Sequence, residues 1–212
     1  MDLLQILRQG DALTQGVALL MLVMSVASWV VILWKLWFLR RVGADILAGV
    51  SAFWQAASVA EARARLADLE REPLVSCLVD ATEPPTGGLA AGGDRAQQLT
   101  RSLRDALHGL TDRLQFGQVL LATVGSTAPF VGLLGTVWGI YHALAGLTGG
   151  GQVTLDQVAG PVGEALVMTA AGLAVALPAV LAYNVFNRRV ARLEATLEGF
   201  AFDLRDLLAG KS

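Results

Sequence analysis

Hydrophobic residues gather in three long runs, and these runs predict three helices that cross a membrane. The runs extend over residues 16–39, 119–147 and 161–187. Each is longer than the roughly 20 mostly apolar residues that a helix needs to cross a bilayer. We therefore expect an all-α membrane protein with three transmembrane helices.

The segments before and after the first run have helical patterns of their own. Residues 1–15 place their leucines on one side of a short helix, which suits a helix lying on the membrane surface. In residues 40–118, Ser58 and Glu61 have the spacing of a capping box. The Gly- and Pro-rich stretch at 83–93 predicts a loop.

The second and third crossings are each expected to extend into a long cytoplasmic helix. Asp94 is placed to cap a helix that continues through Arg113 into the second crossing. The Gly149–Gly151 run, in the loop at 148–160, ends the helix of the second crossing. Thr154 and Gln157 have the spacing of a capping box and begin the helix of the third crossing. The third helix continues to about residue 208 and carries an apolar stripe: Leu193, Leu197, Phe200, Leu204 and Leu207. Because no independent soluble core is expected, this stripe needs a partner.

The distribution of basic residues predicts how the chain is oriented. Of the sixteen Lys and Arg residues, nine lie between Arg40 and Arg113, five follow Phe186, and none lies in 148–160. Since loops rich in Lys and Arg stay in the cytoplasm, we expect 40–118 and 188–212 inside and 1–15 and 148–160 outside. Aromatic and basic residues at the inner end of the first crossing form an interfacial belt: Trp29, Trp34, Trp37, Lys35, Arg40 and Arg41.

Composition argues against several classes of protein. More than half of the residues are hydrophobic and only 16% are charged, which is typical of membrane proteins. One cysteine, Cys77, and two histidines make a disulfide or a metal cluster unexpected. We find no nucleophile with a base, no phosphate-binding Gly loop and no nucleic-acid-binding patch, so we expect no enzyme activity, no cofactor and no nucleic-acid partner.

Three polar residues in the second and third crossings are candidates for an ion pathway. Thr136 and Thr169 each lie 18 residues from a polar residue that marks the inner interface, or roughly 27 Å along a helix. Glu164 lies about a turn further out. Ionisable groups at membrane depth usually mark ion pathways. Alternatively, each threonine bonds to its own backbone, and Glu164 is an interfacial residue favoured by the helix dipole.

Prolines and glycines in the same two crossings predict kinks and close helix contacts. Pro129 and Pro178 each remove one backbone hydrogen bond. Small residues form faces that allow helices to approach closely: Gly132, Gly135 and Gly139 in the second crossing, and Gly172 and Ala176 in the third.

Two stretches resemble the MotA/TolQ/ExbB proton-channel family. They are STAPFVGLLGTVWGIYHAL at 126–144 and GEALVMTAAGLAVALPAVLAYNVFNRRV at 163–190, and the resemblance is close over about 95–205. The sequence of the first stretch is more similar to the ExbB branch of the family than to the TolQ branch. The resemblance implies a multi-pass protein of the bacterial inner membrane with a periplasmic N-terminus and a cytoplasmic C-terminus. It also implies that Thr136, Glu164 and Thr169 are the functional polar residues.

The resemblance further implies partners and a role. A homopentamer would surround the helices of an ExbD-like partner and work with a TonB-like protein, within membrane lipid. Such a complex transmits proton-motive force to outer-membrane receptors for iron siderophores and cobalamin. The titrating carboxylate would belong to the partner's helix. A TolQ-like subunit serving TolA-dependent envelope constriction, or a purely structural membrane scaffold, is the alternative.

Overall fold

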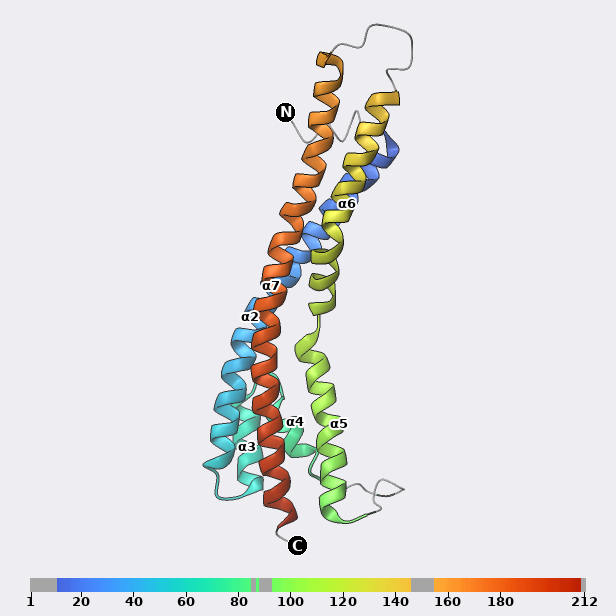
Figure 1. Cartoon of the computed structure of the whole chain (residues 1–212). Helices are drawn as coiled ribbons and strands as arrows, with labels where there is room; N and C mark the ends of the chain where they lie inside the picture. Colours follow the sequence, from blue (N-terminus) through green and yellow to red (C-terminus); the bar gives the residue numbers. More distant parts are fainter. Residues whose placement is uncertain (1–10, 85–86, 88–92, 146–154, 211–212) are drawn as a thin grey trace. The chain divides into compact units, whose positions relative to one another are not determined.

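The computed structural model describes residues 11–84, 87, 93–145 and 155–210, and most of them form α-helices (Figure 1). The helices are α2 (Ala12–Trp54), α3 (Val59–Leu69), α4 (Val75–Asp80), α5 (Arg95–Gln115), α6 (Gln118–Ala145) and α7 (Leu155–Ala209). No strand occurs within these ranges. The all-α class is confirmed. The surface helix expected at 1–15 falls mainly outside the described residues, as do Gly149–Gly151 and Thr154.

Three of these helices are long and apolar enough to cross a membrane. They are α2, α6 and the part of α7 from Ala159 onward, with mean hydropathies of 2.5, 1.6 and 2.2 over their most apolar windows. Large apolar side chains on them are exposed, such as Phe130 at 70% and Leu181 at 66%. Such a surface is unfavourable in water and suits contact with lipid chains.

Two of the crossing helices extend well beyond a bilayer's thickness, as expected; the third crossing is one of them, but the other is the first crossing and not the second. The long helices are α2, with 43 residues, and α7, with 55. Asp94 does cap α5, since its carboxylate accepts the Gln97 N–H at 2.7 Å. The expectation that this helix continues into the second crossing is wrong, because α5 ends at Gln115 and α6 begins at Gln118.

Gly117 explains the break between α5 and α6. Its φ of +79° is one that residues with a Cβ rarely adopt. A Cβ at this position would also lie 2.9 Å from Cγ1 of Val31. The break therefore depends on a glycine for both its backbone conformation and its packing.

The chain divides into two compact units, which we describe separately. The span unit contains Met1–Trp34 and Gly117–Val185, and the base unit contains Lys35–Phe116 and Phe186–Ser212. The helices α2 and α7 each contribute to both units.

The base unit has a hydrophobic core of its own, so the expectation of no independent core outside the membrane is wrong. Fully buried side chains come from five helices, among them Ile46, Leu66, Leu78, Leu110 and Leu204. Because these residues are far apart in the sequence, local periodicity does not reveal that they share one core.

The apolar stripe of α7 forms part of this core. Phe200 packs edge-on against Phe53 with ring centroids 5.1 Å apart, and Leu197 and Leu204 are buried. Leu193 and Leu207 are half-buried. The stripe is therefore largely covered within its own chain, which corrects the expectation that it needs an outside partner.

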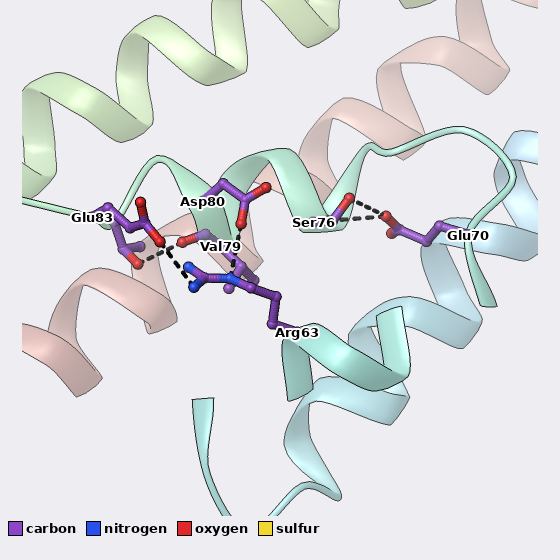
Figure 2. A network of polar contacts seen from close by, with 7 residues as sticks. Arg63, Glu70, Ser76, Val79, Asp80 and Glu83 are labelled. Atoms are coloured by element: carbon purple, nitrogen blue, oxygen red, sulfur yellow. Dashed lines mark hydrogen bonds and ion pairs between the residues drawn. The ribbon is translucent and has the colours of Figure 1, made fainter. Parts of the chain in front are cut away.

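The short helices α3 and α4 are joined by polar contacts (Figure 2). The Glu70 carboxylate accepts the N–H groups of Val75 and Ser76 at 2.9 and 3.0 Å and so caps α4. Arg63 of α3 pairs with Asp80 and Glu83, each at 2.9 Å. These ion pairs are partly exposed, so each contributes little to the stability of the fold.

Ser58 and Glu61 cap α3, as their spacing predicted. The Ser58 hydroxyl accepts the Glu61 N–H at 3.2 Å, and the Glu61 carboxylate accepts the Ala57 N–H at 3.0 Å. The bond from Ala57, together with the charge of Arg65, lowers the pKa of Glu61 below its usual value. The carboxylate therefore remains ionised and caps the helix at neutral pH.

Candidate functional site

The span unit brings Thr136 of α6 and Thr169 of α7 into direct contact. Their hydroxyl oxygens lie within hydrogen-bonding distance of each other, and either can be the donor. The Thr136 hydroxyl also lies 3.1 Å from the Gly132 carbonyl oxygen and 3.3 Å from that of Ala165. Thr136 is only 7% exposed. The two residues that the sequence singled out therefore form one small polar cluster between two apolar helices.

The donors and acceptors of the two hydroxyl groups determine which hydrogen bonds this cluster can form. Each hydroxyl has one proton to donate and can accept from others. When Thr136 donates to the Gly132 carbonyl, Thr169 can donate to Thr136. Alternatively, Thr136 donates to the hydroxyl oxygen of Thr169. The cluster can therefore rearrange its hydrogen bonds without forming a charge in the membrane.

Glycines allow α6 and α7 to approach closely enough for this contact. A Cβ on Gly132 would lie 2.7 Å from the Met168 carbonyl oxygen, and one on Gly172 would lie 2.6 Å from that of Ala128. Added Cβ atoms at Gly135 and Gly139 would lie 3.1 Å and 2.9 Å from the side chains of Met168 and Ala165. The helix contact is therefore built from the small residues on the expected faces.

Gly125 belongs to the same contact, although the sequence analysis did not single it out. A Cβ there would lie 2.5 Å from Cγ2 of Val180. Its signal in the sequence is its position seven residues before Gly132, which places both on one face of α6.

Pro129 and Pro178 both lie inside continuous helices. Pro129 is within α6 and Pro178 within α7, and both are half-buried. Each proline leaves the carbonyl four residues earlier without its usual helical donor. Both helices nevertheless continue through the proline.

Glu164 is not part of the threonine cluster. Its side chain is exposed on α7, and it makes no hydrogen bond or ion pair with any residue that the structure describes. Its neighbour Ala165 is the residue whose carbonyl approaches Thr136. The structure thus brings together two of the three expected polar residues and leaves the carboxylate apart.

Two other hydroxyls in α6 are bonded within their own helix. Ser126 and Thr127 are exposed, and both donate to the Thr123 carbonyl oxygen, at 3.0 and 2.7 Å. This local bonding is the common behaviour of Ser and Thr in membrane helices. Thr136 differs because its hydroxyl also meets a second helix.

Lys35, which the sequence grouped with the residues of an interfacial belt, is a buried residue. It is 0% exposed, and its ammonium donates to the carbonyl oxygens of Leu114 at 2.8 Å and Phe116 at 2.6 Å. These carbonyls lie at the end of α5, where a helix leaves its last carbonyls unpaired and favours a cation. The acceptors follow Lys35 by 79 and 81 residues, so no local pattern reveals them.

Comparison with known proteins identifies the family of this chain. The family model described as the MotA/TolQ/ExbB proton channel family matches residues 71–199, which include the threonine cluster. The chain is 42% identical to "Biopolymer transport protein ExbB" of Xanthomonas campestris pv. campestris, over 94% of this chain and 83% of that protein. It is 39% identical to the protein of the same name from Neisseria meningitidis, over 96% of each.

A second group of relatives matches over a shorter range. "Tol-Pal system protein TolQ" of Pseudomonas aeruginosa is 43% identical over 53% of this chain and 49% of its own length. Similarity to the ExbB proteins therefore extends along nearly the whole chain, whereas similarity to this TolQ protein covers about half of it.

Proposed function

Because the chain belongs to the MotA/TolQ/ExbB proton channel family, we propose that it is a non-enzymatic motor subunit that couples proton-motive force to transport. It is a multi-pass protein of the inner membrane. Its partners in this proposal are an ExbD-like and a TonB-like protein, and the process served is uptake of iron siderophores and cobalamin through outer-membrane receptors.

The observation that carries the proposal is the buried contact between Thr136 and Thr169. A carboxylate on a partner helix would be neutral when protonated and could then pass an apolar surface. Hydroxyls that can both donate and accept would hydrogen-bond that carboxyl group in either protonation state. Thr136 and Thr169 supply such groups, and Glu164 adds a carboxylate on the outer side.

In the proposed complex, several copies of the chain, five in our hypothesis, form a ring around the partner helices. The proton enters from the outer side, neutralises the partner's carboxylate and leaves it on the inner side. Each charge that crosses the membrane supplies about 2.3 kcal/mol per 100 mV. A single proton can therefore bias one step of the partner relative to the ring.

The test uses cells in which this chain is the only subunit of its kind and measures siderophore uptake driven by proton-motive force. We expect Thr136→Val and Thr169→Val each to reduce uptake by about tenfold or more, because each loses a hydrogen bond to a charged group, which is worth about 1.5–3 kcal/mol. Thr127→Val is the matched control, since Thr127 is exposed and bonded only within α6. Normal uptake by both threonine variants would count against the hydroxyl pathway.

Glu164→Gln tests whether the outer carboxylate takes part. If its charge contributes to proton entry, uptake should fall while the amount of assembled complex stays the same. Full uptake by this variant would remove the charge of Glu164 from the mechanism.

A TolQ-like role is the second candidate, and the partial match to a TolQ protein is the observation that favours it. Such a subunit would act with TolR and TolA in envelope constriction. The longer match to ExbB proteins favours the first role. Purification of the complex from cells decides between them, because ExbD and TonB or TolR and TolA would be recovered with this chain. A structural scaffold would instead function without proton-motive force.

A further inference from the structure

Trp138 of α6 carries a polar group that the proposed proton coupling does not use. Its indole nitrogen is buried and has no hydrogen-bond partner among the residues that the structure describes. Nearly all buried N–H groups in proteins are hydrogen-bonded, because an unpaired one bears the full cost of losing its water. We therefore expect an acceptor close to Trp138.

Two aromatic side chains pack against the Trp138 ring without being placed to accept its proton. The ring centroids of Tyr141 and His142 lie 5.7 and 6.0 Å from it, with interplanar angles of 38° and 31°. The indole N–H points outward in the plane of its ring, so a ring packed over the face at such angles meets it poorly. These contacts restrict the rotation of the indole and leave its N–H for another group.

The contact between Gly139 and Ala165 makes Trp138 and Glu164 neighbours within the span unit. A Cβ added to Gly139 would lie 2.9 Å from the Cβ of Ala165, so α6 and α7 touch at these two residues. Trp138 comes directly before Gly139, and Glu164 comes directly before Ala165. Because the two helices are antiparallel, the Cα atoms of Trp138 and Glu164 are separated by about 3 Å along the helix axes.

Trp138 and Glu164 also lie on the same side of this contact. Each is rotated by about 100° from the residue that makes the contact, and in antiparallel helices the two rotations lead to one side. Gly135 and Met168 lie on this side too, and it faces α2. A Cβ on Gly135 would lie 3.2 Å from Cγ1 of Val17, and Met168 packs with Val17 in one apolar cluster. The side chains of Trp138 and Glu164 therefore flank the contact together.

Glu164 has the acceptor that Trp138 lacks. Its side chain is exposed and makes no hydrogen bond or ion pair with any residue that the structure describes. An indole N–H only donates and an ionised carboxylate only accepts, so these two groups are complementary. A hydrogen bond to an ionised acceptor is also roughly twice as strong as one between neutral groups.

We propose that Trp138 is a positioning residue for Glu164: its indole N–H donates to the Glu164 carboxylate and holds it beside the Gly139–Ala165 contact. The inference rests on the proposed function for what Glu164 does, but the hydrogen bond itself requires no proton-motive force. The pair is distinct from Thr136 and Thr169, which lie on the opposite side of the contact.

The first test measures how fast the indole protons exchange with D2O. It uses NMR of the full chain with 15N-labelled tryptophan, in detergent and in its natural oligomeric state, and W138F assigns the signal of Trp138. E164A should accelerate exchange of the Trp138 indole proton by about tenfold or more, because a hydrogen bond to a charged group is lost. The exposed Trp29 and Trp37 are internal controls, and their signals should exchange as before.

Two further variants separate the carboxylate from a general disturbance of α7. Leu166→Ala is the matched control, because Leu166 is exposed and lies as far from Ala165 as Glu164 does, but on the opposite side. It should leave exchange of the Trp138 indole proton unchanged. E164Q keeps an acceptor without the charge, so it should give a rate between those of the unmodified chain and E164A.

The second test measures siderophore uptake driven by proton-motive force, at equal amounts of assembled complex. If Trp138 acts through Glu164, W138F should lower uptake by no more than E164Q does, and W138F/E164Q should equal E164Q alone. A tryptophan with only a structural role would instead lower uptake further in the E164Q background, because independent effects add.

Two results would overturn the proposal. The first is an unchanged exchange rate of the Trp138 indole proton in E164A. The second is lower uptake by W138F/E164Q than by E164Q alone. Full uptake by E164Q would be a failure of the proposed role of Glu164 in proton coupling, and the exchange rates would still decide whether the hydrogen bond exists.

Discussion

At the scale of single residues, the close packing of α6 against α7 depends on two glycines. Gly132 and Gly172 leave no room for a Cβ between the two backbones. The sequence indicated these glycines through their helical spacing, because close packing in membranes favours small residues at such intervals. It did not indicate which glycine limits the approach, since this depends on the crossing of two helices.

Gly132→Ala should force α6 and α7 apart. Its Cβ would lie 2.7 Å from a backbone oxygen, which has little freedom to move. We expect a loss of about 1–3 kcal/mol in stability, typical of overpacking, measured by thermal unfolding in detergent. Gly163→Ala is the control, because nothing lies within 4 Å of the added Cβ. An unchanged melting temperature for Gly132→Ala would contradict the observed packing.

Lys35→Met should destabilise the base unit. The methionine is similar in length but leaves the carbonyls of Leu114 and Phe116 without their donor. The loss is partly offset because a buried charge is also removed, so we expect about 1–3 kcal/mol overall. Arg40→Met, at an exposed position of the same helix, should change thermal stability little. Equal stability of the two variants would show that the Lys35 bonds contribute nothing.

At the scale of elements, the break between α5 and α6 separates two segments that the hydrophobic pattern joins into one. Two features produce it: the positive φ of Gly117 and the donation of Lys35 to carbonyls at the end of α5. Helical periodicity on both sides of the break is uninterrupted, so only Gly117 itself marks the position in the sequence. The expected helix starts at Asp94 and Ser58 were recognisable because capping depends on residues within one turn.

Gly117→Ala tests this break. Left-handed backbone costs a residue with a Cβ about 1–2 kcal/mol, and the contact with Val31 adds to it. Hydrogen exchange of the α5 and α6 amides next to the break should therefore become faster. Gly109→Ala, inside α5 with nothing within 4 Å of the new Cβ, should not have this effect.

A second substitution separates the two causes. Val31→Ala combined with Gly117→Ala relieves the steric contact but not the backbone strain, so it should restore only part of the loss. Full restoration would assign the whole effect to packing, and no restoration would assign it to φ.

At the scale of the whole molecule, the chain is built from two units with different surfaces. The span unit exposes large apolar side chains, as a protein in lipid does, and the base unit buries its own core. The helices α2 and α7 supply residues to both units, so one continuous helix meets two different environments.

Phe200→Ala should weaken the base unit. It removes a buried ring that packs against Phe53, and such substitutions cost about 3–5 kcal/mol. Limited proteolysis in detergent should then cut within residues 40–116 faster than in the unmodified chain. Phe202→Ala, at a ring that is 56% exposed, is the control. Equal rates of proteolysis for the two variants would contradict a stabilising role of Phe200 in the core of the base unit.

The sequence by itself determined the three apolar runs, the all-α class, two helix caps and the family. These features are local: partitioning into lipid, helical periodicity and capping each depend on residues within a few turns. The tertiary structure decided the burial of Lys35, the core of the base unit and the contact between Thr136 and Thr169. It also assigned the second long helix to α2, because the α5–α6 break and the packing around α2 involve residues tens of positions apart.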